Sequence, residues 1–555
     1  MEIDCENFSK KVPDFIFNRL VAGKNVLVDA PPGLGKTRSG AKVAVKLVKE
    51  TEKRILIIEP TKTLRRLVTN YIRQEDKEIE FHESKGWADY RCPIIGASAD
   101  PSFCSFRKET CKCERIKCDV LSDIEKVKTS KLTVATFAKF LLARGLFADY
   151  DIFIIDESHG FENAERSFLQ SYVMIDKLSE VSQELECDFP ELSEKLRKLA
   201  EGLRRLEGLC GNSTPLTIRE IGLIKEFLDD SIFRDVWVEC VRQNKHPSYR
   251  NLYSNLSSLH FKMQNLSKNL FFFYEGALYG RPKNMELEIS NFFRNKDVCL
   301  LSATIDDPIE HAKGCGLDMR RFDESCALML KDYPAQRRRN RKLIAISNGP
   351  SLTRSDEYEY QKARDVANRF LFEILKKFPV KTLVLFRGYN DQKLAWEFLR
   401  DTEIKNRVHN IWQGEDPEMV EDKINKLKES DIVLSSASTR LWEGVDIPGL
   451  RLVIIDALPY PGKDPLSREY NFKEAHQVMI KKLKQGLGRI VRSNDDWGAA
   501  IVIDRRFVQR FSYLAPKLPW YMDEDFEKLP FDHAIEELEK FISARRNTGN
   551  EGNNC

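Results

Sequence analysis

Residues 30–37 read Ala-Pro-Pro-Gly-Leu-Gly-Lys-Thr and lie between a short apolar run and a predicted helix. Gly33 and Gly35 allow the backbone to wrap around an anion, so that several N–H groups and the positive end of the helix dipole point at it. Lys36 would then reach the β- and γ-phosphates of a nucleotide, and the Thr37 hydroxyl would hold Mg²⁺. A chance Gly/Pro turn is the alternative, but the order of strand, loop and Gly-Lys-Thr favours a phosphate-binding loop.

An acidic pair follows a second apolar run. Asp156 and Glu157 come directly after residues 152–155, which read Ile-Phe-Ile-Ile. Ligands of open α/β sheets bind at the carboxyl ends of the strands, where this pair would lie beside the phosphate-binding loop. Asp156 would hold Mg²⁺ directly or through water, and Glu157 would orient the water that attacks the γ-phosphate. Such pairs are common after strands, so the catalytic interpretation depends on the upstream loop.

A group of five cysteines within 27 residues is the densest cluster of thiols in the chain. Four thiolates that converge on one point make a metal site. The segment has no Cys-x-x-Cys pair of the kind that zinc ribbons use, so an iron-sulfur cluster fits better than zinc, and free buried thiols are the remaining alternative. One thiol is surplus, and the spacing leaves open whether it is Cys111 or Cys113. The candidate ligands are Cys92, Cys104, Cys111, Cys113 and Cys118.

Composition limits the class of protein. The chain has 555 residues, enough for three or four domains or insertions. Because 89 Lys and Arg nearly balance 86 Asp and Glu, any surface for nucleic acid must be local. There is no apolar run of about 18 residues and no secretory signal, so we expect a cytoplasmic protein whose 13 cysteines form no disulfide framework.

Short apolar runs followed by helix-like sequence predict the elements that position these residues. They are typical of buried parallel strands in an α/β sheet, and they fall into two sets. Two gaps, near 80–130 and 162–290, are too long for crossover helices and predict inserted domains. A basic run at 337–342 predicts a solvated linker between the two sets. The predicted strands are 26–28, 55–58, 132–135, 152–155 and 298–301, then 382–386, 432–434, 452–455 and 500–503.

The second gap has the pattern of packed helices. From Pro190, leucines recur at alternating spacings of four and three residues, which gives one apolar stripe on a helix. A second helix is predicted from Pro215. A stripe that binds a partner is the alternative to a packed subdomain. The stripes are Leu192, Leu196, Leu199, Leu203 and Leu206 in the first helix, and Ile218, Ile221, Ile224 and Leu228 in the second.

Five short motifs then carry a family resemblance. Residues 156–159, Asp-Glu-Ser-His, resemble the DEAH-type box of superfamily 2 helicases, and Thr61-Lys62-Thr63 is similar to their motif Ia. Ser302-Ala303-Thr304 resembles motif III, residues 442–446 motif V, and residues 485–492 motif VI. With a cysteine insertion between motifs Ia and II and a helical insertion between II and III, nearly the whole chain resembles the XPD/DinG family of iron-sulfur helicases.

The resemblance assigns roles to residues near the end of the chain. Arg489 and Arg492 are three residues apart, so a helix would place both guanidinium groups on one face, toward a γ-phosphate across a cleft. A surface ion pair is the alternative for these two. By resemblance Gln485 faces the same cleft, while Glu443 and Asp446 link it to bound DNA, with Asp446 counted among the nucleotide-binding residues. Motif III would couple hydrolysis to movement between domains.

The fold implied by the resemblance is α/β, with two RecA-like motor domains and, in the first, an iron-sulfur insertion and a helical, arch-like insertion. The DNA strand would pass between the two insertions. The predicted boundaries are 1–82, 131–161 and 291–335 for the parts of motor domain 1, 83–130 for the iron-sulfur insertion, 162–290 for the arch-like insertion, 336–540 for motor domain 2 and 541–555 for a disordered tail.

The implied activity is ATP-dependent unwinding by a helicase that moves 5′ to 3′ on single-stranded DNA, in repair or replication. Its cofactors would be ATP, Mg²⁺ and an iron-sulfur cluster of the 4Fe-4S type. Single-stranded and forked DNA would be its partners, with repair or replication proteins, and the chain would be a monomer that binds no membrane. One alternative is a translocase that displaces proteins or RNA:DNA hybrids, and another is a nucleic-acid-binding scaffold with an inactive ATPase.

Two further expectations concern DNA and adenine. Bound single strands need phosphate donors and aromatic rings, and the motif positions suggest Thr61, Lys62 and Thr63 in the first domain and Arg387 with Tyr389 in the second. Relatives carry an Arg-x-x-Gln element before the phosphate loop that reads adenine, but the first glutamine here is residue 74. Either adenine is not selected, or backbone groups near residues 15–18 read it.

Overall fold

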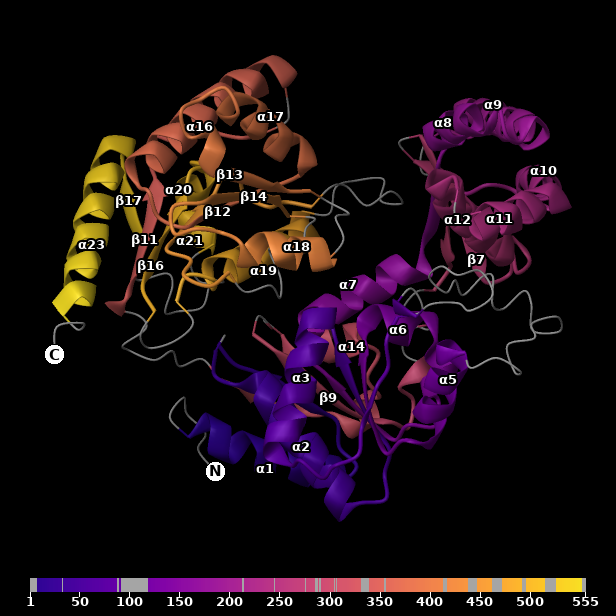
Figure 1. The fold of residues 1–555 in the computed structure, drawn as a ribbon, viewed down its shortest axis with the longest axis horizontal. Coiled ribbons are helices and arrows are strands. Elements are labelled where there is room, and N and C mark those ends of the chain that lie inside the picture. Colours follow the sequence, from indigo (N-terminus) through magenta and orange to yellow (C-terminus); the bar gives the residue numbers. More distant parts are fainter. Residues whose placement is uncertain are drawn as a thin grey trace.

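The computed structural model of the chain contains two α/β domains and a mainly helical subdomain (Figure 1). Within the described part of the chain, no helix is both long and apolar enough to cross a lipid bilayer. The structure describes residues 7–31, 33–86, 89–90, 118–211, 214–243, 245–274, 276–284, 288, 291–303, 305, 307–330, 339–353, 356–412, 417–437, 447–461, 472–491, 496–514 and 526–551.

The first α/β domain is built on a parallel sheet with strand order β10-β1-β9-β5-β2-β4-β3. Five of these strands are the apolar runs predicted from the sequence, and they are buried on both faces as a helix-covered parallel sheet requires. Strands β1 and β5, which precede the phosphate-binding loop and the acidic pair, both pair with β9, so their carboxyl ends lie close together. The strands are β1 (Val26–Asp29), β2 (Ile55–Glu59), β3 (His82–Glu83), β4 (Leu132–Thr136), β5 (Ile152–Ile155), β9 (Asp297–Ser302) and β10 (Ala327–Met329).

Helices cover both faces of this sheet, and each face has its own apolar core. Ile57 and Ile154 pack on one side with the first three helices, while Ile58 and Ile155 pack on the other with an aromatic cluster. The first side holds α1 (Phe8–Val21), α2 (Lys36–Glu50) and α3 (Lys62–Glu75). The second holds α5 (Asp119–Thr129), α6 (Phe137–Leu142), η3 (Arg144–Phe147), α7 (Ser158–Leu169), α14 (Pro308–Gly314), η4 (Met319–Arg321) and η5 (Glu324–Cys326).

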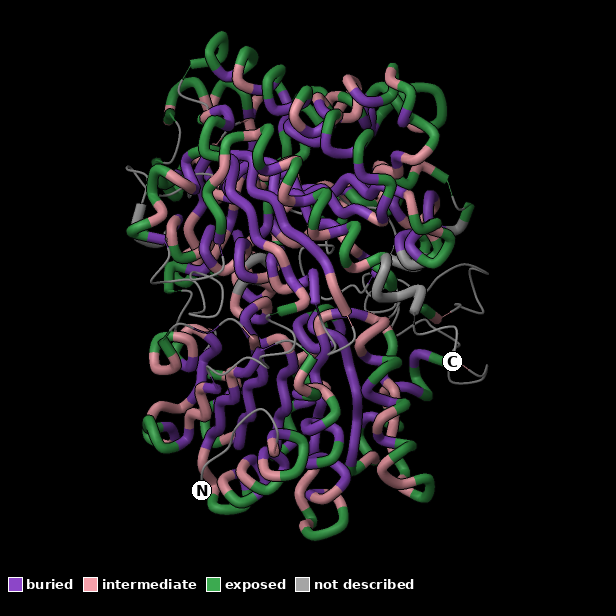
Figure 2. Tube along the Cα trace, turned by 90° about the vertical axis from the view of Figure 1, so that its left-hand side faces the viewer, coloured by how far each residue is buried: buried purple, intermediate pink, exposed green. Residues whose placement is uncertain are grey.

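The second α/β domain repeats this plan with a parallel sheet of order β13-β14-β12-β15-β16-β11-β17. All four strands predicted for this domain are present, and buried residues concentrate along both sheets (Figure 2). The strands are β11 (Arg341–Ile346), β12 (Thr382–Phe386), β13 (Val408–Ile411), β14 (Ile432–Ser436), β15 (Leu452–Ile455), β16 (Gly498–Val502) and β17 (Phe526–Leu529). The helices are α16 (Glu357–Lys377), α17 (Tyr389–Leu399) and α23 (Phe531–Glu551) on one face, and α18 (Pro417–Asn425), α19 (Phe472–Leu487), α20 (Arg506–Gln509) and α21 (Phe511–Leu514) on the other, with η6 (Lys405–Arg407) before β13.

The subdomain inserted between β5 and β9 is helical, as predicted. Four of the five leucines in the first stripe are buried, so the stripe is core. The second helix begins at Ile218, directly after its cap Thr217, and Ile218 is 76% exposed, so it is not part of the buried apolar face. The sequence prediction missed an antiparallel sheet of order β6-β8-β7. The elements are β6 (Ser171–Met174), α8 (Ile175–Leu185), α9 (Pro190–Cys210), α10 (Ile218–Leu228), α11 (Ser231–Gln243), α12 (Pro247–Met263), β7 (Asn269–Tyr274) and β8 (Ala277–Pro282).

Two other predictions differ from the structure. Residues 341–342 of the basic run are not linker but begin strand β11, where Lys342 pairs with Glu527 at 2.5 Å, so its charge is compensated. Helix α23 continues to Glu551 through most of the predicted disordered tail. Its apolar residues pack against the second domain, and the ring of Phe541 lies 6.2 Å from that of Trp497. Phe541 and Ile542, the first residues of the predicted tail, therefore belong to the packed part of the second domain.

Candidate nucleotide site

The phosphate-binding loop has the backbone conformation that its sequence predicts. Gly33 and Gly35 have φ angles of 75° and 89°, a region that residues with side chains rarely enter. Helix α2 begins directly afterwards, so its first N–H groups lie at the loop. The Lys36 ammonium donates hydrogen bonds to the carbonyl oxygens of Ala30 and Pro31 at 2.6 and 3.2 Å. The lysine is thus held at the loop by groups that a phosphate can replace.

Asp156 and Glu157 lie beside this loop at the end of β5. One carboxylate oxygen of Asp156 accepts a hydrogen bond from the Thr37 hydroxyl at 2.5 Å, and the other accepts from the Glu157 N–H at 2.9 Å. Burial raises the pKa of Asp156, while Thr37 and Lys36 act in the opposite direction. Glu157 adopts a left-handed backbone with φ 46°. Such conformations are costly for residues with a side chain and concentrate at functional sites.

His159 connects the acidic pair to the end of the neighbouring strand β9. Its Nδ1 lies 3.1 Å from the Ser302 hydroxyl and 3.3 Å from a carboxylate oxygen of Glu157. Burial, reinforced by nearby positive charges, lowers the pKa of His159 well below its usual value, so the imidazole is neutral. The Ser302 carbonyl accepts a hydrogen bond from the Ala30 N–H at 3.0 Å. The phosphate-binding loop, the acidic pair with His159, and Ser302 therefore form one hydrogen-bonded unit.

Helix α19 of the second domain meets this unit. The Lys481 ammonium donates a hydrogen bond to the backbone carbonyl of His159. Arg489 is buried and close enough for its charge to lower the pKa of His159. Both amide atoms of Gln485 are buried without a hydrogen-bond partner among the described residues. Four other predicted site residues, Thr304, Glu443, Asp446 and Arg492, lie outside the described part of the chain.

The side chains present fit a nucleoside triphosphate with Mg²⁺. In sites of this kind Mg²⁺ keeps several waters and takes one or two protein oxygens besides the phosphates. Thr37 and Asp156 supply two such oxygens at one point. Gln485 supplies a buried amide that still requires a partner. Among the described residues no group of three or more His, Cys, Asp or Glu side chains could hold a metal by itself, so the substrate would have to complete the coordination.

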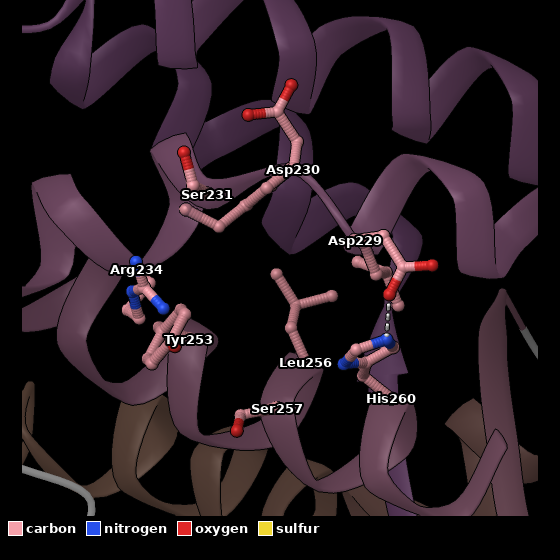
Figure 3. A pocket seen from close by; sticks show the side chains of 10 residues that line it. Asp229, Asp230, Ser231, Arg234, Tyr253, Leu256, Ser257 and His260 are labelled. Carbon is pink, nitrogen blue, oxygen red and sulfur yellow. Dashed lines mark hydrogen bonds and ion pairs between the residues drawn. The ribbon is translucent and has the colours of Figure 1, made fainter. Parts of the chain in front are cut away.

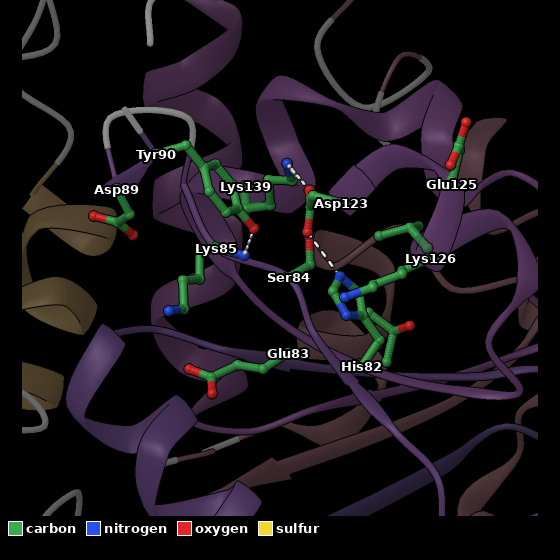
Figure 4. A network of polar contacts seen from close by, with 12 residues as sticks. His82, Glu83, Ser84, Lys85, Asp89, Tyr90, Asp123, Glu125, Lys126 and Lys139 are labelled. Carbon is green, nitrogen blue, oxygen red and sulfur yellow. Dashed lines mark hydrogen bonds and ion pairs between the residues drawn. The ribbon is translucent and has the colours of Figure 1, made fainter. Parts of the chain in front are cut away.

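The base of the cysteine insertion is described, although most of the insertion is not. Four of the five predicted ligands, Cys92, Cys104, Cys111 and Cys113, lie outside the described residues, and Cys118 is half-buried at the start of α5. Figure 4 shows the network between its flanks, where Asp123 accepts hydrogen bonds from His82 at 2.7 Å and Lys139 at 2.8 Å. Burial by itself would raise the pKa of Asp123, but the hydrogen bonds with His82 and Lys139 outweigh burial, so the pKa lies below its usual value. The network fixes helix α5 to strand β3 at the sheet edge.

The side chains that the sequence suggests for DNA binding differ in their exposure and in their hydrogen-bond or ion-pair partners. Thr61 caps helix α3 by accepting a hydrogen bond from the Leu64 N–H, which makes its hydroxyl a structural group. Lys62 pairs with Asp89 at 2.5 Å, and Arg387 pairs with Asp391. Tyr389 is 45% exposed, and its ring lies 5.3 Å from that of Trp412. Among the positions that the sequence suggests, Tyr389 therefore offers an exposed ring on which a base could stack, with Trp412 beside it.

The helical subdomain contains a pocket whose lining includes none of these motif residues; Figure 3 shows its lining side chains. It is lined by the end of α10 and by α11 and α12, and its charged groups include Asp229, Asp230 and His260. His260 contacts Asp229 at 2.6 Å, and Asp230 pairs with Lys195 outside the pocket. These acidic groups are therefore already compensated, and the pocket offers no ligand chemistry comparable to that of the nucleotide site.

Two residues of the site were missed by sequence reasoning. Glu59 ends the apolar strand β2 and is fully buried next to the acidic pair. A charged residue that directly ends an apolar run was a usable signal, since buried strands of parallel sheets rarely contain carboxylates. Lys481 gave no such signal, because it lies in a helix with several other lysines.

Comparisons with known proteins agree with this division of the chain. Residues 371–522 match the family model of the helicase C-terminal domain. Residues 9–185 match a model described as the res subunit of type III restriction enzymes. The first match lies in the second α/β domain, and the second match covers the phosphate-binding loop and the acidic pair.

Curated relatives include several helicases. A probable ATP-dependent helicase of Methanocaldococcus jannaschii is 28% identical over 313 residues, which are 51% of this chain and 46% of that protein. The ATP-dependent DNA helicase YoaA of Haemophilus influenzae is 29% identical, over 32% of this chain and 28% of its own. The ATP-dependent DNA helicase DinG of Photobacterium profundum is 27% identical, over 26% and 24%. The chain thus spans less than half the length of these relatives.

Solved structures extend the likeness to nearly the whole chain. An XPD helicase superposes with a TM-score of 0.65 at 16% identity, covering 94% of this chain and 99% of that one. Xpd4 of S. tokodaii gives a TM-score of 0.56 at 15% identity, with coverage of 94% and 99%. At these identities the likeness shows the fold, including the two parallel sheets and the helical insertion.

Proposed function

We propose that this chain, which belongs to the XPD/DinG type of superfamily 2 helicases, hydrolyses ATP to move on single-stranded DNA and to separate duplexes. The observation that carries the proposal is the meeting of two domains at one nucleotide site. Lys36, Thr37 and Asp156 converge at the edge of the first sheet, and Lys481 of the second domain donates a hydrogen bond to His159 beside them.

The described residues suggest how the site acts. Lys36 would exchange its two loop carbonyls for the phosphates, and Thr37 with Asp156 would hold Mg²⁺, which neutralises charge on the transferred phosphoryl group. Glu157 would orient the attacking water. Arg489 would reach the γ-phosphate from the second domain and stabilise the charge that develops there. Both domains would contact the nucleotide. Its hydrolysis would therefore change the distance between the domains and shift the residues that hold the DNA strand.

The finer parts of the proposal concern direction and the cysteine insertion. We infer 5′ to 3′ movement, a role in DNA repair or replication and a 4Fe-4S cluster on four of the five cysteines of the insertion. The support for the cluster is the group of five cysteines in the sequence, and the hydrogen bonds of Asp123 with His82 and Lys139 attach the flank of the insertion to the sheet. Purified protein should contain about four irons and absorb visible light, as the proposed cluster type requires. A colourless protein with stoichiometric zinc would contradict the cluster.

Strand displacement is the direct test of the function. Duplexes with a 5′ or a 3′ single-stranded tail should differ, with ATP-dependent unwinding of the 5′-tailed substrate. Displacement of a bound protein without unwinding of either duplex would support a translocase instead. An ATPase that DNA does not stimulate would contradict both.

Replacement of Lys36 tests the nucleotide site. Lys36→Ala should lower ATP turnover by roughly 10³-fold or more, because the phosphates lose their charge partner, while single-stranded DNA binding persists. The matched control is Lys49→Ala on the same helix, where the lysine is exposed and pairs with Asp76 at the surface. ATP turnover measured with saturating DNA should be unchanged in this control. Substantial turnover by Lys36→Ala would contradict the site.

A further inference from the structure

Glu59 is a buried carboxyl group whose oxygens lack a partner in the described part of the chain. Its side chain is 0% exposed, and neither carboxyl oxygen has a hydrogen-bond partner within the described residues. Burial raises the pKa of Glu59 well above its usual value, and the negative charges of Asp156 and Glu157 add to the effect. Because an unsatisfied buried carboxyl costs free energy, its presence at this position indicates a partner that the described residues do not supply, such as a bound ligand.

The sheet register places Glu59 beside the acidic pair. Ile58 is paired with Ile155, and the Asp156 N–H donates to the Ile58 carbonyl at 3.1 Å, so Glu59 and Asp156 are neighbours at the sheet edge. Side chains alternate along a strand, and Ile57 and Ile154 both pack under helices α2 and α3. Glu59 and Asp156 therefore point to the same face of the sheet, the face on which Thr37 contacts Asp156.

The chemical groups around Glu59 indicate what kind of partner its carboxyl group can have. Among the described residues, the charges that act on Glu59 are two carboxylates and no basic side chain. A proton can neutralise such a group in the free protein, but a hydrated cation satisfies both oxygens at once. Among the described residues no group of three or more His, Cys, Asp or Glu side chains could hold a metal by itself, so Glu59 is not assigned as a direct ligand. Glu59 can instead contact the water molecules bound to the ion, because Mg²⁺ in proteins usually keeps several of its waters.

We propose that Glu59 is a positioning residue for the metal–nucleotide complex, and that its carboxylate accepts hydrogen bonds from water molecules on the Mg²⁺ held by Thr37 and Asp156. The inference rests on the proposed nucleotide site. Outer-shell partners of this kind orient a metal and typically change its affinity or activity by about 10–100-fold when removed.

Metal affinity tests this role separately from turnover. Mn²⁺ serves as the probe in place of Mg²⁺, and its binding to the full-length protein with ADP is followed by the electron paramagnetic resonance of free Mn²⁺. Glu59→Gln should weaken Mn²⁺ binding by about 10–100-fold. Binding of a fluorescent ADP analogue without metal should stay within about twofold, since the phosphate contacts of Lys36 are untouched. The Mg²⁺ concentration needed for half-maximal ATP turnover should rise in parallel.

The matched control is another buried glutamate of the same domain. Glu165 on α7 also has a buried oxygen without a partner among the described residues, but it pairs with Arg144 away from the nucleotide loop. Glu165→Gln should leave Mn²⁺ affinity unchanged. Glu59→Asp, which keeps the charge, provides a second variant and should bind Mn²⁺ more tightly than Glu59→Gln.

The outcomes separate this inference from the proposed function. Equal Mn²⁺ affinity in Glu59→Gln and wild type would overturn it, as would a loss of turnover with unchanged metal dependence, which would assign Glu59 to the attacking water instead. If the wild type binds Mn²⁺ with ADP in a Glu59-dependent way but does not unwind DNA, the inference holds and the helicase function fails.

Discussion

The two parallel sheets place an aspartate at the same point but surround it differently. Asp156 follows β5 and Asp456 follows β15, and both are buried. Two N–H groups of Arg364 donate to the two oxygens of Asp456 at 2.6 and 2.5 Å. Asp156 instead meets a hydroxyl and a backbone N–H. Burial raises the pKa of Asp456, but two donors of an always charged guanidinium keep this pair ionised.

A second pair of carboxyl groups repeats the difference. Asp504, which follows β16, is bound by the guanidinium of Arg506, whereas Glu59 at the end of β2 has no partner among the described residues. At these strand ends the second domain therefore pairs its buried acids with arginines, whereas Asp156 and Glu59 have no basic hydrogen-bond partner among the described residues. One consequence is that Mg²⁺ and nucleotide should stabilise the first domain more than the second.

The largest effect should follow from breaking the ion pair in the second domain. Arg364→Met leaves Asp456 buried without its counterion, and should lower the free energy of unfolding by about 3–5 kcal/mol. Urea unfolding monitored by circular dichroism measures this. The double variant Arg364→Met with Asp456→Leu removes both charges and should recover most of the loss. A single variant as stable as wild type would show that the two sheets do not differ in this way.

An intermediate effect concerns pH and the first domain. Burial raises the pKa of Glu165 to about 7 despite the neighbouring Arg144. The folded protein thus keeps a proton on Glu165 that the unfolded chain releases near the ordinary pKa of 4.5. The contribution of this proton to the free energy of unfolding is fully present below pH 4.5 and is lost as the pH rises toward 7. The loss should reach about 3 kcal/mol. Unfolding free energies measured across this pH range should depend less on pH in Glu165→Gln, and an unchanged slope would contradict the assignment.

The smallest effect should come from the contact that joins the domains. Lys481→Met removes the hydrogen bond to the His159 carbonyl, which at about 1.5 kcal/mol corresponds to roughly a tenfold change in an equilibrium between domain arrangements. We expect DNA-stimulated ATP turnover to change by about tenfold or less, with little effect on stability.

The control for this contact is the exposed Lys540 on α23, which pairs with Glu537 on the opposite face of the second sheet. Lys540→Met removes the same kind of charge from the same domain, and it should leave turnover unchanged. Equal turnover in Lys481→Met and wild type at every DNA concentration would show that the contact does not influence the domain arrangement.

The sequence predicted local features well where neighbouring residues carry the information. The conformation of the phosphate-binding loop depends on two glycines and the helix that follows, all adjacent in the chain. The strands were found because their residues are apolar on both faces. The missed sheet of the helical subdomain contains Gly280 and Pro282, residues that weaken a strand prediction, and β7 and β8 stabilise one another by pairing. The predicted tail was given too early a start, because Phe541 packs against Trp497.

The amino-acid sequence by itself determined the kind of chemistry, since Gly-Lys-Thr, Asp-Glu and the residues around Arg489 each form a recognisable local motif. Only the tertiary structure decided which groups meet. Lys481 and His159 are 322 residues apart, and Arg364 and Asp456 are 92 apart. The partner of each buried charge depends on strand order and register, which arise from the packing of the whole sheet. For this reason Glu59 and Asp456, both acids at strand ends, have opposite surroundings that their local sequences do not reveal.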